Sequence, residues 1–294
     1  MWTVAALYRF VSLTDLPALQ AEIRAACETN DICGTLLIAP EGINGTIGGI
    51  GEKLDAVIGL LDRLCGVREG ELKYSTSTGK PFLRMKVRIK KEIITMAAPE
   101  ADPTKLVGTY VEPEDWNALI ADPDVTLIDT RNDYETAVGI FKGAIDPNIA
   151  KFTDFKDFVA EKMDPARQKK VAMFCTGGIR CEKASSYMLA HGFEEVYHLK
   201  GGILKYLETV PADQSQWDGE CFVFDRRVAV GHGLEEGEHD ICYGCRFPLK
   251  PGDKQHAQYE AGVSCPRCHA DLTPHKAESL RMRHSQFSKH NAGE

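Results

Sequence analysis

The chain has 294 residues, 43% of them hydrophobic and 27% charged, which is ordinary for a soluble globular protein and long enough for two or three domains. The formal net charge of -8 argues against a basic surface over the whole chain, although a local basic patch is compatible with it. No stretch approaches the roughly 20 uninterrupted apolar residues of a membrane span. Residues 1–12 carry one cation and no cleavage pattern, unlike a signal peptide. We therefore expect a cytoplasmic protein without membrane association, whose cysteines stay reduced.

The first 95 residues alternate between strand-like and helix-like patterns. Strands are expected at 4–11, 33–39 and 82–89, and helices at 15–29 and 54–64, where apolar residues recur at helical spacing. Asn44-Gly45 is a strong two-residue hairpin signal, so we place a hairpin turn there. The order β-α-β-β-α-β predicts a ferredoxin-like, or acylphosphatase-like, domain over residues 1–95.

The strand predicted at 82–89 carries cations at every second position. Because side chains alternate between the two faces of a strand, the cations share one face while the apolar residues between them pack inward. One interpretation is a solvated sheet face or a charge-protected edge. The other is a surface that contacts the phosphates of RNA. The cations are Arg84, Lys86, Arg88 and Lys90.

A new pattern begins after residues 96–110, where prolines lie between charged residues and predict a linker. Buried strands are expected at 125–129, 170–174 and 196–199, with helical segments between them. This alternation predicts a parallel sheet with helices on both faces, in an α/β domain over residues 111–215.

The strand 170–174 leads directly into Cys175. Gly177 and Gly178 allow a tight turn, and a helix begins near Cys181. Backbone N–H groups at the helix start, together with Arg180, should lower the pKa of the Cys175 thiol and stabilise a sulfur anion. An inert buried cysteine would leave this combination of features unexplained. Cys181 is either a neighbour of the helix start without chemistry or a resolving thiol.

Residues 121–215 resemble a rhodanese domain. The resemblance implies that Cys175 takes up sulfur as a persulfide, that Asp129 braces the loop and that Arg131 is structural. Cysteine-dependent phosphatases require five residues between cysteine and arginine, whereas four separate Cys175 from Arg180. The matching stretches are Asp129-Thr130-Arg131, Gly139-x-x-x-Gly143-Ala144-Ile145, the six-residue loop that opens with Cys175, Gly192-Phe193 and Leu199-Lys200-Gly201-Gly202.

The last region, residues 216–294, contains two CxxC turns separated by nineteen residues, Cys242-x-x-Cys245 and Cys265-x-x-Cys268. This spacing is typical of a structural Cys₄ zinc site. Redox chemistry is the alternative, but nothing thioredoxin-like surrounds either pair. The region is poor in core residues, and we expect a polar, partly ordered extension after residue 279. The remaining cysteines are expected in the core: Cys27, Cys33, Cys65 and Cys221.

The whole chain, from about residue 4 to residue 275, resembles the rhodanese-like tRNA uridine hydroxylases. The resemblance implies oxygen-dependent conversion of the wobble uridine, position 34 of tRNA, to 5-hydroxyuridine, with O₂ as co-substrate, tRNA as partner and a structural zinc. Catalysis would involve Cys175, Arg180, Cys181 and Asp129, while the cationic strand would help to hold tRNA. A persulfide-carrying sulfurtransferase and a non-enzymatic RNA-binding scaffold are the alternatives, and no electron donor is indicated. The stretches that carry the resemblance are 41–46, 86–93, 129–135, 175–183 and the four-cysteine tail.

Overall fold

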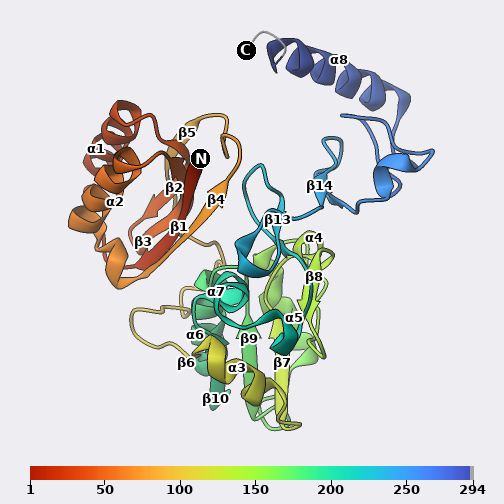
Figure 1. Ribbon diagram of the computed structural model, residues 1–294. Coiled ribbons are helices and arrows are strands. Elements are labelled where there is room, and N and C mark those ends of the chain that lie inside the picture. The colour runs from red at the N-terminus through yellow and green to blue at the C-terminus, as the bar shows by residue number, and fades with distance from the viewer. Residues whose placement is uncertain (292–294) are drawn as a thin grey trace. The chain divides into compact units, whose positions relative to one another are not determined.

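A computed structural model describes residues 1–291 (Figure 1). The chain forms two compact units, Met1–Glu236 and Gly237–Glu294. Within the part of the chain that is described, no helix has the length and apolar character needed to cross a membrane. The first unit contains both the N-terminal and the central α/β domain.

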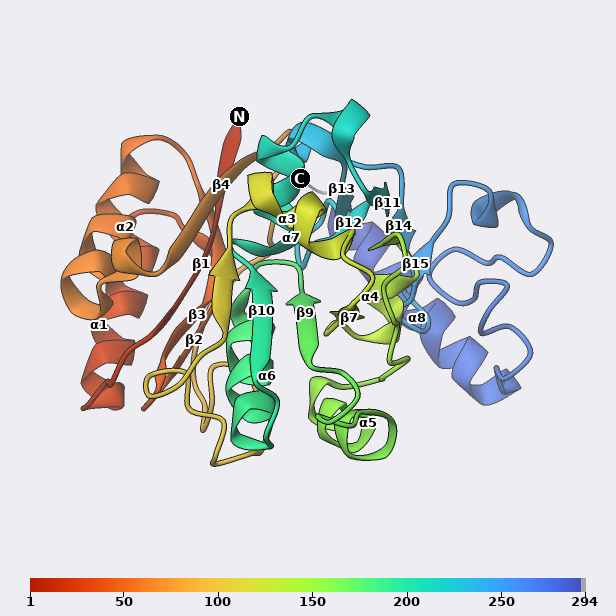
Figure 2. The same ribbon diagram turned by 90° about the horizontal axis from the view of Figure 1, so that it is seen from below.

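The N-terminal domain is a five-stranded sheet in the order β4-β1-β3-β2-β5. Its first six elements follow the predicted ferredoxin-like order, and β5 is added at the edge, parallel to β2. Residues of α1 and α2 such as Ile23 and Ile58 pack with Leu36 of the sheet in one apolar core. Both helices therefore cover the same face of the sheet (Figures 1 and 2). The elements are β1 (Trp2–Phe10), α1 (Leu16–Thr29), β2 (Cys33–Ala39), β3 (Gly42–Gly49), α2 (Glu52–Cys65), β4 (Glu71–Ser77) and β5 (Met85–Ile89).

Two predictions for this domain are wrong. The hairpin turn lies at residues 40–41, where Ala39 pairs with Gly42, and not at Asn44-Gly45, which lies inside β3. Gly45 is required for close packing rather than for a turn, because an added Cβ would lie 2.0 Å from the Thr35 carbonyl oxygen. The strand that completes the ferredoxin-like order is β4, which the sequence analysis missed, and the strand predicted at 82–89 is the additional β5. β4 lies at an edge of the sheet and is rich in polar residues, so its apolar alternation is weak.

The central domain confirms the predicted parallel sheet with helices on both faces. Its strands are ordered β6-β10-β9-β7, and every neighbouring pair is parallel. One core packs α5 and α6 against the sheet, and a second packs α3 and α7 against the other face. The elements are β6 (Thr109–Val111), α3 (Pro113–Ile120), β7 (Val125–Asp129), α4 (Asp133–Thr136), β8 (Gly139–Phe141), α5 (Phe155–Lys162), β9 (Lys170–Phe174), α6 (Ile179–Ala190), β10 (Glu195–Leu199) and α7 (Gly202–Thr209).

The segments that flank this domain pack against it. In the stretch predicted as a linker, Met96, Ala98 and Ala101 are buried in the core beneath α6, and β6 begins before residue 110. Residues 216–236, which the sequence analysis assigned to the cysteine-rich tail, belong to the first unit. The reason is apolar packing: Trp217 in β11 (Trp217–Gly219) meets the ring of Phe141 edge to face at 5.0 Å. A small hairpin follows, formed by β12 (Cys221–Phe222) and β13 (Ala229–Val230).

The second unit has little regular structure before its terminal helix. A short hairpin joins β14 (Asp240–Ile241) to β15 (Pro248–Leu249), and α8 (Pro274–Asn291) follows. The partly ordered extension predicted after residue 279 is wrong, because Leu280 of α8 packs against Val263 and the residues up to Asn291 are helical. Short 3₁₀ helices in the two units lie at Val67–Glu69, Phe152–Asp154, Ala212–Gln214, His232–Leu234 and Asp253–Gln255.

Candidate active site

The reactive loop connects β9 to α6 and is anchored by the first turn of α7. The N–H of Ile203 donates to the carbonyl of Cys175 at 2.9 Å, and the N–H of Leu204 donates to the carbonyl of Thr176 at 3.1 Å. Gly202 permits this close approach, since a Cβ there would lie 2.5 Å from the Cys175 carbonyl oxygen. The backbone around Cys175 is therefore fixed by an element that follows it by almost thirty residues.

The two loop cysteines are both fully buried, but their surroundings shift their thiol pKa values in opposite directions. Burial alone would raise the pKa of Cys175. The Cys181 thiol, the Arg180 guanidinium and the N–H groups of Cys181 and Gly178 outweigh that effect and hold the pKa well below its ordinary value. The Gly178 N–H donates to Cys175 Sγ at 3.1 Å. Burial and the neighbouring Cys175 raise the pKa of Cys181, so Cys175 is the more readily ionised thiol of the pair.

Arg180 is held in place by Glu135, a residue to which the sequence analysis gave no role of its own. The two side chains form a bidentate pair with both N–O distances at 2.6 Å, and both are buried. Thr176 also donates to Glu135 at 3.2 Å, so this carboxylate braces the loop from below. Burial would raise the pKa of Glu135, but Arg180 holds it below its ordinary value. The capping box formed by Asn132 and Glu135 at the start of α4 is a sequence signal that could have drawn attention to this residue.

Asp129 was predicted to brace the loop, but its carboxylate is paired with Arg131. The Arg131 guanidinium donates to both Asp129 oxygens at 2.7 to 3.1 Å, and both side chains are fully buried. In the described chain, the hydrogen bonds of the Asp129 carboxylate go to Arg131 and none goes to the loop. Arg131 also donates to the carbonyl of Glu135 at 3.2 Å. Asp129 can therefore act on the loop only through Arg131 and Glu135.

The four cysteines predicted as core residues are buried. Burial raises the pKa of Cys27 and Cys221 to about 12 and that of Cys65 to about 11, and it also raises the pKa of Cys33. These thiols are protonated at neutral pH and are weak nucleophiles. Cys175 is at least as deeply buried as these four cysteines, so burial cannot explain why its pKa is lowered. The difference comes from the hydrogen-bond donors and the charge around its sulfur.

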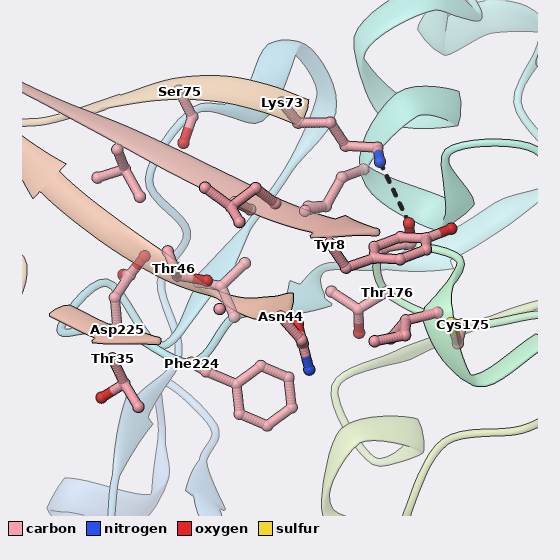
Figure 3. Close-up of a pocket in the computed structure, with 18 of the residues that line it drawn as sticks. Tyr8, Thr35, Asn44, Thr46, Lys73, Ser75, Cys175, Thr176, Phe224 and Asp225 are labelled. Carbon is pink, nitrogen blue, oxygen red and sulfur yellow. Dashed lines mark hydrogen bonds between the residues drawn. The ribbon is translucent and has the colours of Figure 1, made fainter. Parts of the chain in front are cut away.

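A cavity of about 470 Å³ lies between the reactive loop and the face of the N-terminal sheet that α1 and α2 leave open (Figure 3). This volume is typical of small-molecule sites. Cys175, Thr176 and Arg180 line one wall. The opposite wall is formed by side chains of β1 to β4, and residues 223–234 contribute a third side. The labelled wall residues in Figure 3 are Tyr8, Thr35, Asn44, Thr46, Lys73, Ser75, Phe224 and Asp225.

Side chains of the N-terminal sheet reach the reactive loop directly. Lys73 donates to the carbonyl of Gly177 at 3.2 Å, the bond drawn as a dashed line in Figure 3, and its Nζ lies 5.9 Å from the centroid of the Tyr8 ring. Tyr8 donates to Glu182 of α6 at 2.7 Å. On the next residue of α6, buried Lys183 donates to Glu41 at 3.0 Å and also pairs with Glu92. These contacts hold the sheet against the start of α6, so the cavity has two firmly connected walls.

Glu182 is a protonatable group beside the loop. Burial raises its pKa to about 7 against the opposing hydrogen bonds from Tyr8 and Tyr110, and the charges of Glu71 and Cys175 raise it further. Burial and Glu182 in turn raise the pKa of Tyr8 well above its ordinary value, so Tyr8 stays protonated and can donate. Because Tyr8 also lines the cavity, the pair can take up or release a proton at the cavity wall near neutral pH.

The predicted cationic strand lies beside the same cavity wall. In the parallel pairing of β2 with β5, Lys86 is the partner of Thr35 and Arg88 is the partner of Leu37. Thr35 and Leu37 line the cavity, and paired residues project to the same face, so Lys86 and Arg88 lie on the cavity face of the sheet. Arg84 and Lys90 flank β5 and are exposed. The row of cations therefore continues the cavity wall to the sheet edge.

In the second unit, the four sulfurs of Cys242, Cys245, Cys265 and Cys268 all lie within 4.8 Å of one another. Three of the separations between them are 4.0, 3.8 and 3.7 Å. Tetrahedral Zn–S bonds of about 2.3 Å place sulfurs about 3.8 Å apart, so the cluster has the geometry that a tetrahedral metal requires. Cys242 and Cys265 are buried together with Leu249 in a very small core. These four residues could hold a metal ion.

Comparison with known proteins identifies the family. Residues 2–93 match the family described as UPF0176 acylphosphatase like domain, and residues 112–209 match the Rhodanese-like domain. A protein of Teredinibacter turnerae named tRNA uridine(34) hydroxylase is 54% identical over 97% of this chain and 89% of its own length. This chain belongs to the tRNA uridine(34) hydroxylase family. The family membership confirms the predicted resemblance and the predicted fold class.

Two further members of the tRNA uridine(34) hydroxylase family show the same extent of similarity. The protein of Sinorhizobium fredii is 53% identical over 97% of this chain and 91% of its own length. The protein of Picosynechococcus sp. is 51% identical over 97% of this chain and 96% of its own length. The similarity extends across the reactive loop and the cysteine cluster, and is not restricted to the rhodanese-like part.

Proposed function

We propose that this chain hydroxylates uridine 34 of tRNA to 5-hydroxyuridine, with O₂ as co-substrate. The observation that carries the proposal is the Cys175 thiolate at the wall of a cavity of about 470 Å³, in a chain that is 54% identical to a relative named tRNA uridine(34) hydroxylase. Enzymes that modify a base bring it out of its stack into a fitted pocket, and this cavity is large enough for one nucleoside.

The thiolate suggests how C5 of the ring is activated. Addition of Cys175 Sγ to C6 of uracil pushes an electron pair toward C5, which then attacks an oxygen species derived from O₂. Loss of the C5 proton and expulsion of the thiolate restore the ring. In the balanced reaction one oxygen atom is inserted into the C5–H bond and the other leaves as water, with two electrons from an external reductant and two protons. The Tyr8 hydroxyl lines the cavity and donates to Glu182, so Glu182 can accept the proton through Tyr8.

The remaining parts of the chain support this function. The sulfur separations of 3.7 to 4.0 Å support a structural zinc at Cys242, Cys245, Cys265 and Cys268, which would supply folding free energy to a unit with little core. The cationic row supports binding of tRNA phosphates by Arg84, Lys86, Arg88 and Lys90. A tRNA substrate also favours the cytoplasm as the place of action. Asp129, Arg180 and Cys181 would act by positioning and stabilising the Cys175 thiolate.

The second candidate is a sulfurtransferase that carries a persulfide on Cys175. It is favoured by the match of residues 112–209 to the Rhodanese-like domain. The extended cavity wall of the N-terminal sheet has no role in transfer to a small acceptor such as cyanide. The two candidates therefore differ in whether that sheet is required.

The test is nucleoside mass spectrometry of tRNA from a deletion strain complemented with wild type, Cys175→Ala or Cys27→Ala. Cys27→Ala is the matched control, because Cys27 is equally buried but lies in the core of the N-terminal domain. Loss of a catalytic nucleophile lowers rates by roughly 10³-fold or more, so Cys175→Ala should abolish 5-hydroxyuridine derivatives while Cys27→Ala retains them. Full hydroxylation by Cys175→Ala would contradict the proposal. Loss of a thiolated nucleoside instead would establish sulfur transfer.

A further inference from the structure

The open face of the N-terminal sheet carries a small group of polar side chains at the cavity wall. Thr46 of β3 is the register partner of Thr35 in β2, and Asn44 is the partner of Tyr8 in β1. Side chains paired across antiparallel strands lie about 5 Å apart, and residues two apart on a strand share a face. Asn44, Thr46 and Thr35 therefore form one contiguous patch, and all three line the cavity.

The polar atoms of this patch are available to a ligand. Asn44 Nδ2 donates to the carbonyl of Ile93 at 2.9 Å, which fixes the amide so that Oδ1 remains as an acceptor. Among the hydrogen bonds between described residues, none is donated to Asn44 Oδ1 and none involves the hydroxyl of Thr35 or Thr46. All three side chains are half-buried, so they face the cavity rather than bulk solvent.

An aromatic ring and the reactive loop lie on either side of the patch. Phe224 lines the same cavity and is 56% exposed, so its ring is available for a base to stack on. In the view of Figure 3 its ring is drawn near the Asn44 side chain. On the other side, Tyr8 adjoins Asn44 and donates to Glu182, the residue that follows Cys181. A planar ligand that contacts Asn44 thus has Phe224 and the thiol loop within reach.

We propose that Asn44, Thr35 and Thr46 form the subsite that reads the base-pairing edge of uracil, with Asn44 Oδ1 accepting the N3–H. Uracil presents one donor, N3–H, between two carbonyl acceptors, which complements one fixed acceptor beside two hydroxyls. Cytosine presents a lone pair at N3 and would face Asn44 Oδ1 with like charge. Turning the amide to accommodate cytosine would break its bond to Ile93. The inference rests on the proposed function for the identity of the RNA and assigns the residues that select the base.

The experiment measures binding of the full-length protein to two anticodon stem-loop RNAs that differ only in U34 or C34, by fluorescence anisotropy. One base-edge contact gives about 10-fold discrimination, so wild type should bind the U34 RNA about 10-fold more tightly. In Asn44→Ala this ratio should fall to about one. Thr46→Val, which removes the hydroxyl at constant shape, should lower the ratio to a smaller extent.

Thr76→Val is the matched control, because Thr76 is exposed on the opposite face of the same sheet and should leave the ratio unchanged. Both RNAs are titrated into the same protein sample, so any loss of folded protein cancels in the ratio. An unchanged ratio in Asn44→Ala, or no preference in wild type, would overturn the subsite. Formation of 5-hydroxyuridine is assayed separately: absence of product with the U34 preference intact would overturn the proposed function and leave the subsite standing.

Discussion

The reactive loop and the cysteine cluster use the same residue type in opposite ways. In the loop each sulfur has its own partners: Cys175 accepts the Gly178 N–H at 3.1 Å, and Cys181 lies 3.5 Å from the Thr130 hydroxyl. In the cluster, three of the sulfur separations are 3.7, 3.8 and 4.0 Å, and all four sulfurs lie within 4.8 Å of one another. Unequal hydrogen-bond donors lower the pKa of Cys175 and leave that of Cys181 raised, whereas four sulfurs at similar separations could hold a metal ion. The surroundings of a cysteine, and not its burial, decide its role.

The largest expected effect is the unfolding of the second unit when a metal is removed from the cysteine cluster. The two apolar cores of the second unit are very small, one around Cys242, Leu249 and Cys265 and one around Val263, Ala277 and Leu280. Removal of a metal held by the four cysteines should therefore unfold this unit. Structural zinc contributes on the order of 10 kcal/mol of folding free energy in small domains. After chelation, or in Cys265→Ser, amide hydrogen exchange in residues 237–291 should become unprotected.

The loop provides the internal control for that experiment. Peptides from residues 1–236, and the alkylation rate of Cys175, should be unchanged by chelation, because the loop is built entirely from the first unit. A second unit that keeps its protection without metal would show that the four cysteines stabilise it as a packed core and not as ligands.

A smaller effect is expected from Glu182, the carboxyl group beside the reactive loop, on the pH dependence of the unfolding free energy. The pKa of Glu182 is raised to about 7, above an unfolded value of about 4.3. Between about pH 4.3 and pH 7 the folded chain therefore binds more protons than the unfolded chain. The protonated Glu182 stabilises the fold fully below about pH 4.3, and this stabilisation is lost as the pH rises through 7. Between pH 5 and pH 8 the unfolding free energy of wild type should fall relative to Glu182→Gln by on the order of 3 kcal/mol.

The measurement is chemical denaturation at both pH values. Glu161→Gln is the control, because Glu161 is exposed on α5 and should follow wild type. If Glu182→Gln and wild type lose stability in parallel, Glu182 is ionised throughout the interval and does not hold a proton beside the loop.

The sequence predicts those features whose residues are close together in the chain better than contacts between residues that are far apart in the chain. Local signals were sufficient for the thiol loop and for the two CxxC turns, because the residues involved are close in sequence. Asn44-Gly45 misled, since its hairpin signal was overridden by strand pairing on both sides of β3. The partners of α6 were not predictable: Glu182 meets Tyr8, and Lys183 meets Glu41, across contacts that no local pattern encodes.

The smallest expected effect is on the pKa of Cys175, and it tests whether Cys181 lowers that pKa. The Cys181 thiol is the strongest of the groups that lower the pKa of Cys175 against burial. A hydrogen bond donated by Cys181 stabilises the charged form of Cys175, so Cys181→Ala should raise the pKa of Cys175 and shift its alkylation to higher pH. Cys181→Ser is the matched variant, since its hydroxyl can still donate and should keep the pKa close to that of wild type. The pH dependence of Cys175 alkylation, followed by peptide mass spectrometry, measures both.

The same two variants decide between a donor and a resolving thiol. If Cys181 serves as a hydrogen-bond donor, Cys181→Ser should retain most of the 5-hydroxyuridine formation that Cys181→Ala loses, because alkylation and activity would follow the same pKa. If Cys181 must attack an oxidised or persulfidated Cys175, both variants should lose activity equally, since a hydroxyl cannot form a disulfide. Suppose that both variants lose activity equally while the pKa of Cys175 in Cys181→Ser stays close to that of wild type. The two cysteines would then work as a redox couple. The opposite pKa shifts of Cys175 and Cys181 would describe only the protein before it reacts.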